Sequence, residues 1–289
     1  MKPMLAVARR KKYAVGAFNT VDYLSTQAVI HAAEELDAPV IIQFSVKTVK
    51  YWGHAALVNW MRELAGNAGI PVAMHLDHCK DVDFIQQCID AGWTSVMIDA
   101  SSKPFEENLA LSKEVVERAS KAGVAVEAEL GEIGGVEEDI QVADEDAHLA
   151  DPEKAVRFCR EMDLAVFAPA IGTAHGVYKG EPKIAFDRLE EISRRTGVPL
   201  ALHGGTGLSD EVFKRCIALG CAKVNISTQL KYVFIDSIVE YNRNGGAYEP
   251  LKALEHQYHK IKEEMGKNIL LFGGQGRASQ DQPVYADYE

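Results

Sequence analysis

Three segments of this chain open in the same way, with a proline that leads a short apolar run. They begin at Pro39, Pro71 and Pro199, and each run is too short to form a helix. The intervals are 32 residues, from 39 to 71, and 128 residues, from 71 to 199, so the second is four times the first. A repeating unit of one strand and one helix would produce this spacing.

Eight apolar runs of this kind are present, and we interpret them as buried parallel strands. They cover residues 13–19, 39–45, 71–77, 95–99, 124–130, 164–170, 199–203 and 222–226. Segments with helical periodicity alternate with them, at residues 24–36, 81–91, 104–121, 152–162, 187–196 and 209–219. Such alternation specifies a barrel or a doubly wound sheet, and a length of 289 residues favours the eight-unit barrel.

We therefore predict an α/β fold, the (β/α)8 TIM barrel, as a single domain over residues 1–289. The barrel is expected at about 13–241, with extra C-terminal helices in an extension at about 242–289. Two segments depart from the alternation. Residues 131–150 form a glycine-rich, acidic loop after the fifth strand, and a loop of this length is usually functional, here as a lid. The second segment is the tail after Thr228, in which residues 230–241 and 251–265 have helical patterns. Residues 273–289, at its end, are expected to be loose or to depend on a partner.

The charge of the chain limits its partners. A formal net charge of −11 and a pI near 5.4 argue against binding to nucleic acid or to an anionic membrane, because such binding needs clustered Lys and Arg. The N-terminal residues lack the apolar run of a signal peptide, and no stretch of about 18 apolar residues is present. Five cysteines without CxxC spacing fit a reducing compartment. We expect a cytoplasmic protein.

Two imidazoles and a carboxylate follow the apolar run that starts at Pro71, in the order His75, Asp77, His78. In an extended chain alternate side chains share a face, so His75 and Asp77 should point the same way, and His78 should fall where the strand ends. This favours one metal ligand and one acid/base group over a pair of histidine ligands. Taken alone, the stretch is compatible with a hydrogen-bonded polar cluster or with a functional site.

Nearly every predicted strand has a polar residue at its C-terminal end, which in a barrel is where the active site lies. These residues are Asn19, Ser45, Asp77, His78, Asp99, Glu129, His203 and Asn225, with His175 in the loop after the sixth strand. Three of them, His78, His175 and His203, could converge above the barrel axis. Three neutral imidazoles with an open position describe a catalytic zinc site, and nitrogen ligands favour Zn²⁺ over Mg²⁺.

Two glycine-rich loops, at residues 172–176 and 203–207, accompany these histidines. Bare backbone N–H groups and small hydroxyls bind phosphate, and barrels often bind phosphate at the loops after strands seven and eight. Residues 225–228 open the last barrel helix, and Lys179 lies close in sequence. The combination suggests a phosphorylated substrate.

At these residues the chain resembles the class II, metal-dependent ketose-bisphosphate aldolases, closest to the tagatose-bisphosphate and fructose-bisphosphate aldolases. The resemblance runs from about Tyr13 to Thr228, with a weaker match through Tyr248 and residues 272–274. It rests on an ordered set of motifs at residues 17–19, 75–78, 97–101, 127–131, 134–135, 172–176, 203–207 and 223–226.

The resemblance implies a lyase that cleaves a ketose 1,6-bisphosphate reversibly to dihydroxyacetone phosphate and an aldehyde such as glyceraldehyde 3-phosphate. Zn²⁺ held by His78, His175 and His203 would act as a Lewis acid, so that no Schiff-base lysine is needed. Asp77 would exchange the proton of the C4 hydroxyl, and Glu137 or its neighbour Glu138 would be the base at C3. Asp99 and Glu129 would orient a ligand histidine or offer an alternative metal position.

The same resemblance implies the binding residues and the assembly. The substrate and its C1 phosphate would be bound by Asn19, Ser45, Gly176, Lys179, Gly204, Thr206, Asn225, Ser227 and Thr228. A Na⁺ or K⁺ ion beside this phosphate is a further expectation from the family, and so is a homodimer or homotetramer.

The chain departs from the family after Ser45, where lysines at 47 and 50 replace small, glycine-containing residues. Lys47 and Lys50 are either solvated surface charges or ligands for an anionic group distal to the cleaved bond. The sequence therefore leaves the ketose open, as tagatose-bisphosphate, fructose-bisphosphate or another phosphorylated ketose with a distal anion. The stereochemistry at C4 stays open as well.

Two other classes of protein are compatible with parts of the pattern. One is a barrel hydrolase in which zinc activates water, but such sites usually have an early HxH pair and an aspartate on the last strand, where this chain has Asn19 and Asn225. The other is a non-catalytic accessory subunit, whose sign would be missing ligands.

Overall fold

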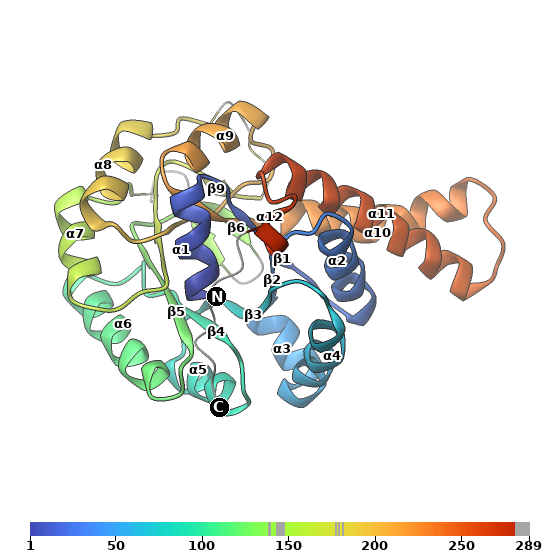
Figure 1. Cartoon of the computed structure of the whole chain (residues 1–289), viewed down its shortest axis with the longest axis horizontal. Helices are drawn as coiled ribbons and strands as arrows, with labels where there is room; N and C mark the ends of the chain where they lie inside the picture. The colour runs from blue at the N-terminus through green and yellow to red at the C-terminus, as the bar shows by residue number, and fades with distance from the viewer. Residues whose placement is uncertain (138–139, 143–147, 177, 179, 181, 281–289) are drawn as a thin grey trace.

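The computed structural model describes residues 1–137, 140–142, 148–176, 178, 180 and 182–280, and eight of its strands close into a barrel (Figure 1). The strand order around the barrel is β1-β11-β10-β8-β5-β4-β3-β2, and all neighbours are parallel. The strands are β1 (Val15–Asn19), β2 (Val40–Ser45), β3 (Val72–Cys79), β4 (Ser95–Ile98), β5 (Ala125–Leu130), β8 (Val166–Pro169), β10 (Leu200–Leu202) and β11 (Cys221–Ile226). The predicted (β/α)8 barrel is confirmed.

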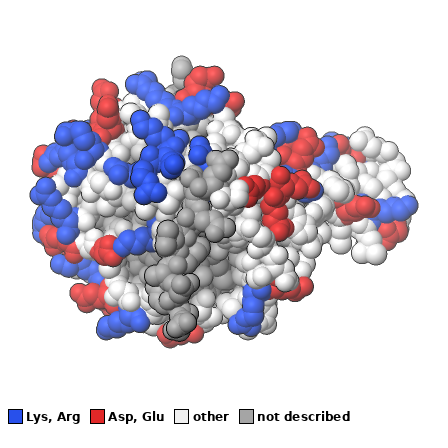
Figure 2. Space-filling view, in the orientation of Figure 1, with Lys and Arg blue, Asp and Glu red and all other residues white. Residues whose placement is uncertain are grey.

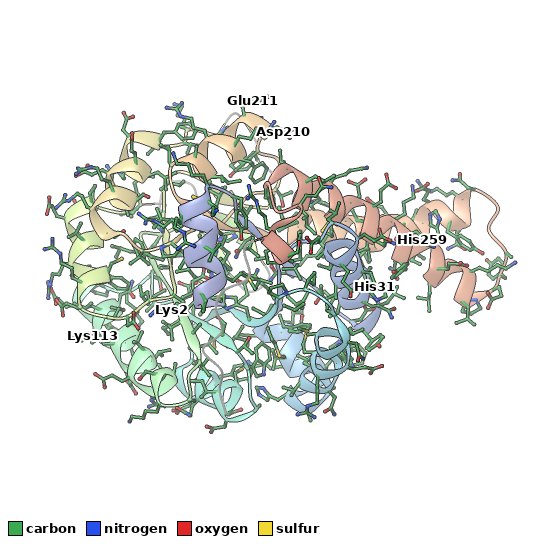
Figure 3. The ribbon with its side chains drawn as sticks, viewed as in Figure 1. Lys2, His31, Lys113, Asp210, Glu211 and His259 are labelled. Carbon is green, nitrogen blue, oxygen red and sulfur yellow. The ribbon has the colours of Figure 1, made fainter. Side chains whose placement is uncertain are left out.

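The helices that alternate with these strands lie close to their predicted positions. They are α2 (Tyr23–Glu35), α5 (Val82–Asp90), α6 (Phe105–Ser120), α7 (Pro152–Arg160), α8 (Phe186–Thr196) and α9 (Asp210–Ala218). Side-chain caps fix several of their starts, because a cap satisfies backbone N–H groups that the first turn leaves free. The Ser209 hydroxyl accepts a hydrogen bond from Val212 N at the start of α9. Asp210 and Glu211 follow in the first turn, where their carboxylates interact favourably with the positive end of the helix dipole (Figure 3).

Three helices that precede β3 were not predicted. Helix α1 (Lys2–Lys11) buries Met4 and Leu5 in an apolar cluster with barrel residues such as Ala17 and Ile41, although basic residues dominate its sequence. Helices α3 (Val46–Trp52) and α4 (His54–Asn67) both lie between β2 and β3. Helix α3 starts at the end of β2 because the Ser45 hydroxyl accepts a hydrogen bond from Thr48 N. The lysines that depart from the family pattern are therefore helical.

Helices α10 (Thr228–Arg243) and α11 (Pro250–Leu271) form a hairpin that projects from the barrel (Figure 1). The base of α11 packs against α2, where His31 Nδ1 lies 2.6 Å from the Tyr258 hydroxyl (Figure 3). The expectation of a loose terminus from residue 273 is wrong for residues 273–280. A short helix, α12 (Arg277–Gln280), follows there, and Ala278 N donates to Asp37 O at 2.9 Å.

Residues 131–150 are not a plain loop, as the sequence suggested. They contain β6 (Gly134–Glu137) and β7 (Ile140–Val142), an antiparallel pair that forms a small sheet with β9 (Ala174–His175). The paired glycines at 134 and 135, which are rare in strands, hid the first of them. None of the helices in the described ranges is both long and apolar enough to span a membrane.

Candidate active site

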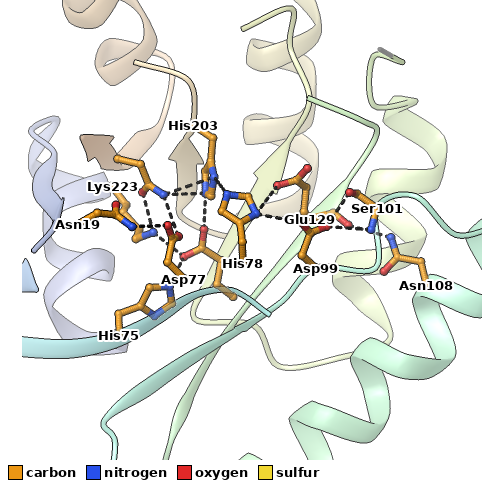
Figure 4. Close-up of polar contacts among 12 residues, drawn as sticks. Asn19, His75, Asp77, His78, Asp99, Ser101, Asn108, Glu129, His203 and Lys223 are labelled. Atoms are coloured by element: carbon orange, nitrogen blue, oxygen red, sulfur yellow. Dashed lines mark hydrogen bonds and ion pairs between the residues drawn. The ribbon is translucent and has the colours of Figure 1, made fainter. Parts of the chain in front are cut away.

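The three predicted imidazole ligands meet at the C-terminal mouth of the barrel. The ring centroids of His78 and His203 are 4.7 Å apart, those of His78 and His175 5.1 Å, and those of His175 and His203 6.1 Å. One nitrogen from each ring lies within 4.8 Å of the others, so the three can hold one metal ion. Figure 4 shows His78 and His203 facing each other across this point.

His78 reaches this point through an unusual backbone. The strand does not end before His78, as the sequence suggested, but continues to Cys79 with a register shift against β4 between Leu76 and Cys79. His78 has φ 44°, in the left-handed region that a residue with a Cβ rarely adopts. A bulge of this kind redirects a side chain. The positive φ costs conformational free energy, and such strain is concentrated at functional sites.

His175 is held by the small sheet. Gly135 on β6 pairs with His175 on β9, and a Cβ at position 135 would lie 2.1 Å from the His175 carbonyl oxygen. Gly135 also has φ 97°, so no other residue fits there without moving the strand that carries His175. The β6–β7 pair and His175 are thus one structural unit.

The partners of His78 and His203 determine which ring nitrogens carry hydrogen. His78 Nδ1 lies 3.0 Å from Asp99 Oδ2, and His203 Nε2 lies 2.7 Å from Glu127 Oε1. Carboxylates only accept hydrogen bonds, so the N–H groups of the neutral rings point at them and the other nitrogens carry lone pairs. Those nitrogens, His78 Nε2 and His203 Nδ1, face each other at 2.8 Å. This contact requires a positive charge between the two nitrogens, and either a proton held by His78 or a divalent cation supplies it.

The acidic groups beside the histidines favour that charge. Burial lowers the pKa of His78, but Asp77, Asp99 and Glu129 outweigh it and hold this pKa well above its usual range. Burial lowers the pKa of His203 to about 4 despite the Glu127 carboxylate, so this ring is neutral. Burial and the neighbouring Asp99 raise the pKa of Glu129 well above normal. Asp99 and Glu129 also form, with His78, a second group of three close enough to hold an ion.

Asp77 lies beside this group with its carboxylate fixed by two amides. Asn19 Nδ2 donates to Oδ2 at 2.7 Å, and Asn225 Nδ2 donates to Oδ1 at 3.3 Å (Figure 4). Gln43 in turn donates to Asn19 Oδ1 at 2.7 Å. Asp77 is only 3% exposed, so it is an oriented acceptor in a nearly dry site.

The predicted phosphate residues also gather in one place. Gly176, Gly204, Thr206, Asn225, Ser227 and Thr228 line a common small cavity together with His175 and Gly205. The buried Ser227 hydroxyl has no hydrogen-bond partner in the described part of the chain. A backbone cradle with an unsatisfied hydroxyl suits an anionic oxygen.

Other predicted residues lie apart or cannot be placed. Lys179 and Glu138 are outside the described residues, and Glu137 is placed only by its backbone in β6. Lys47 is exposed and lines a cavity of about 450 Å³ with Tyr51, Phe234 and others. Lys50 points elsewhere, with Nζ 5.7 Å from the centre of the Phe84 ring.

The sequence analysis assigned no role to three buried residues of the site. His75 was noted only for the direction of its side chain, and Glu127 and Lys223 only as members of family motifs. Glu127 contacts His203, His75 and Lys223 in the barrel interior. A sequence signal for these residues was available: each is polar and lies two positions before another polar residue on the same strand. Because alternate residues of a strand share a face, both side chains point into the barrel. This pattern occurs on β3 at 75 and 77, on β5 at 127 and 129, and on β11 at 223 and 225.

Comparison with known proteins matches this geometry to one family. The model of the family described as fructose-bisphosphate aldolase class-II matches residues 1–277. A fructose-bisphosphate aldolase from Geobacillus stearothermophilus is 42% identical over 97% of this chain and 98% of its own, and one from Staphylococcus aureus is 42% identical over 96% and 98%. The crystal structure of the YdjI aldolase from Escherichia coli K12 is 34% identical, with a TM-score of 0.86 over 96% of this chain and 98% of that one.

Proposed function

Because the chain belongs to the class II fructose-bisphosphate aldolase family, we propose that it cleaves a ketose 1,6-bisphosphate reversibly to dihydroxyacetone phosphate and an aldehyde such as glyceraldehyde 3-phosphate. The enzyme is an aldolase, hence a lyase. The observation that carries the proposal, beside the family match, is an oriented Asp77 carboxylate next to three convergent imidazoles.

The family implies a divalent metal, and the donor set fits one, because two imidazole lone pairs face each other and an acidic surround favours positive charge. We propose that the metal is Zn²⁺ and that His78, His175 and His203 hold it, since three nitrogen ligands suit zinc. When bound, the cation supplies the Lewis acid that polarises the ketose carbonyl. Asp99 orients His78 through Nδ1–H. Glu129, near the same nitrogen, would offer an alternative metal position.

Asp77 takes the proton of the C4 hydroxyl as the C3–C4 bond breaks and returns it in the synthetic direction. The amides of Asn19 and Asn225 keep both carboxylate oxygens in place, so the carboxylate does not reorient between the two directions. Glu137, at the end of β6, or its sequence neighbour Glu138 handles the proton at C3. Closure of this hairpin over the site would exclude water.

The C1 phosphate binds in the cradle of Gly176, Gly204, Thr206, Asn225, Ser227 and Thr228, with Lys179 supplying positive charge. The support for this is the shared cavity of the first six residues and the unpartnered Ser227 hydroxyl. A Na⁺ or K⁺ ion beside the phosphate completes the proposed site. Ser45, the register partner of Asp77 on β2, would lie on the aldehyde side of the cleaved bond.

Lys47, which follows Ser45 by two positions, is the proposed contact for a distal anion of the substrate. We expect Lys47→Met to lower kcat/KM about fivefold for a ketose with a distal phosphate, about 1 kcal/mol, because the lysine is exposed and its charge is partly screened. The matched control is Lys50→Met on the same helix, whose ammonium lies over Phe84. Steady-state assays measure kcat/KM for both variants. Equal values would show that Lys47 is a solvated surface charge without a role in substrate binding.

The alternative functions are not favoured. A barrel hydrolase conflicts with membership of an aldolase family. A non-catalytic accessory subunit conflicts with the presence of all three imidazoles and of an oriented Asp77. The proposal is tested by a cleavage assay across a panel of phosphorylated ketoses, with and without added Zn²⁺. Cleavage of none of them would refute it.

We propose a homodimer or homotetramer, in the cytoplasm, for the intact protein. Exposed apolar side chains support the oligomer: Tyr51 on α3, Tyr232, Ile235 and Val239 on α10, and Leu251 and Leu254 on α11. Uncharged atoms cover much of the projecting hairpin in Figure 2. Sedimentation should give a multiple of 31.7 kDa, and Ile235→Glu should lower it. A wild-type mass of 31.7 kDa would contradict an oligomer. The support for the compartment is that all five cysteines are free thiols.

A further inference from the structure

The barrel interior carries a second polar layer beneath the proposed metal ligands, formed by His75, Glu127 and Lys223, which we call the support layer. All three side chains are fully buried. Each lies two residues before a residue of the mouth on the same strand: His75 before Asp77, Glu127 before Glu129 and Lys223 before Asn225. Buried charges are costly, so an interior that could be apolar needs a reason to hold them.

The contacts of the support layer lead to both halves of the site. Glu127 Oε1 lies 2.7 Å from His203 Nε2, while its Oε2 lies 2.8 Å from Lys223 Nζ and 3.3 Å from His75 Nε2. Lys223 Nζ also donates to Asn225 Oδ1 at 2.7 Å, and Asn225 Nδ2 donates to Asp77. One ammonium group therefore orients a histidine through Glu127 and the proton-transfer carboxylate through Asn225.

His203 depends on this arrangement for its tautomer. With hydrogen on Nε2, facing Glu127, its lone pair is on Nδ1, facing His78 Nε2. An amide or a neutral acid in place of the Glu127 carboxylate would no longer demand hydrogen at Nε2, and the ring could turn its N–H toward the cation position. Lys223 supplies the counter-charge to the buried Glu127 carboxylate, and the same ammonium holds Asn225.

We propose that Glu127, Lys223 and His75 are positioning residues that fix Nδ1 of His203 as the metal-binding atom and hold Asn225 against Asp77. This inference rests on the proposed role of His203 as a ligand. It makes the support layer part of the metal site rather than only part of the barrel core. Hydrogen-bond partners of metal ligands typically contribute about 10- to 100-fold to affinity.

The test measures metal affinity and ligand geometry, not only turnover. Zn²⁺ affinity is determined by competition with a chromophoric chelator, and the visible spectrum of the Co²⁺-loaded protein reports the ligand field. We expect Glu127→Gln, which is isosteric, to weaken Zn²⁺ binding about 10- to 100-fold and to change the Co²⁺ spectrum. Lys223→Met should weaken it similarly, because it leaves Glu127 buried without its counter-charge. The variant that combines Glu127→Gln with Lys223→Met should lose less Zn²⁺ affinity than the product of the two single losses. The reason is that the neutral amide at position 127 needs no counter-charge from the ammonium.

The control is Gln257→Met, which removes a buried side chain that donates to Phe234 O, far along the chain from the site. It should lower thermal stability and leave Zn²⁺ affinity and the Co²⁺ spectrum unchanged. If Lys223→Met does not fold, His75→Gln replaces it, with an expected loss of severalfold in affinity.

Two outcomes separate this inference from the proposed function. If His203→Ala abolishes tight metal binding while Glu127→Gln binds within twofold of wild type with an unchanged spectrum, the support layer is structural only and the inference is wrong. If His203→Ala itself binds metal normally, the ligand assignment of the proposed function is wrong.

Discussion

Treatment with a strong chelator is expected to abolish cleavage of ketose bisphosphates, and added Zn²⁺ is expected to restore it. The reason is that the three imidazoles hold the only electrophile that the proposed chemistry provides, and none of the other described groups at the mouth polarises a carbonyl comparably. Activity should fall by about 10³-fold or more, because the group that stabilises the developing negative charge in the transition state is removed. The measurement is a coupled assay for dihydroxyacetone phosphate on chelated, dialysed and reloaded protein.

His203→Ala is the genetic counterpart of the chelator and should be nearly inactive at Zn²⁺ concentrations that saturate the wild type. His259→Ala, on the outer helix α11, is the matched control and should keep full activity (Figure 3). Full activity in chelator, with substrate-dependent inactivation by borohydride, would instead indicate a Schiff base. Lys223 would then be the first lysine to examine, as it is buried beneath the mouth.

Asp77→Ala is expected to retain bound metal and to lose about 10²- to 10⁴-fold in kcat, because we propose its carboxylate as the group that transfers the C4 hydroxyl proton. The amides of Asn19 and Asn225 would lose this acceptor, while Asn225 Nδ2 would keep its contact with His203, which lies 3.3 Å away at Nε2. Substrate binding through the phosphate cradle should persist, so KM should change less than kcat. Steady-state kinetics on metal-analysed protein measure both.

Asp77→Asn distinguishes charge from shape at this position, since the amide fills the same volume but accepts no proton. It should be as slow as Asp77→Ala. A kcat within a few-fold of wild type for either variant would remove Asp77 from the proton transfer. Loss of metal in both variants would show instead that Asp77 supports the ligands.

Most of the barrel could be predicted because its signals are local. A proline before an apolar run, a glycine after a helix and an N-cap such as Ser209 each act within a few residues. Other features hid two of the missed elements, α1 and β6. Basic residues in α1 mask the buried Met4 and Leu5. Gly135 of β6 allows a close approach to β9, which only the folded chain reveals.

The site was predictable where residue type alone carries the chemistry, as with the imidazoles and Asp77. It was not predictable where geometry re-aims a side chain. The position of His78 at the mouth was predicted, but the path of its backbone was not: β3 continues through it to Cys79, and a positive φ re-aims its ring. The roles of Glu127 and Lys223 depend on contacts between β5 and β11, which are nearly 100 residues apart in the chain.

Closure of the barrel has a consequence for how the enzyme gains activity during folding. The amides that hold Asp77 come from β1 and β11, the first and last strands of the ring, which pair with each other. A chain that has made every strand but the last therefore has the carboxylate of β3 without one of its two anchors and without the lysine of β11. Contacts between distant strands form slowly because their loop-closure entropy must first be overcome. Recovery of turnover after dilution from denaturant would thus report the joining of the two ends of the ring, later than collapse or helix formation.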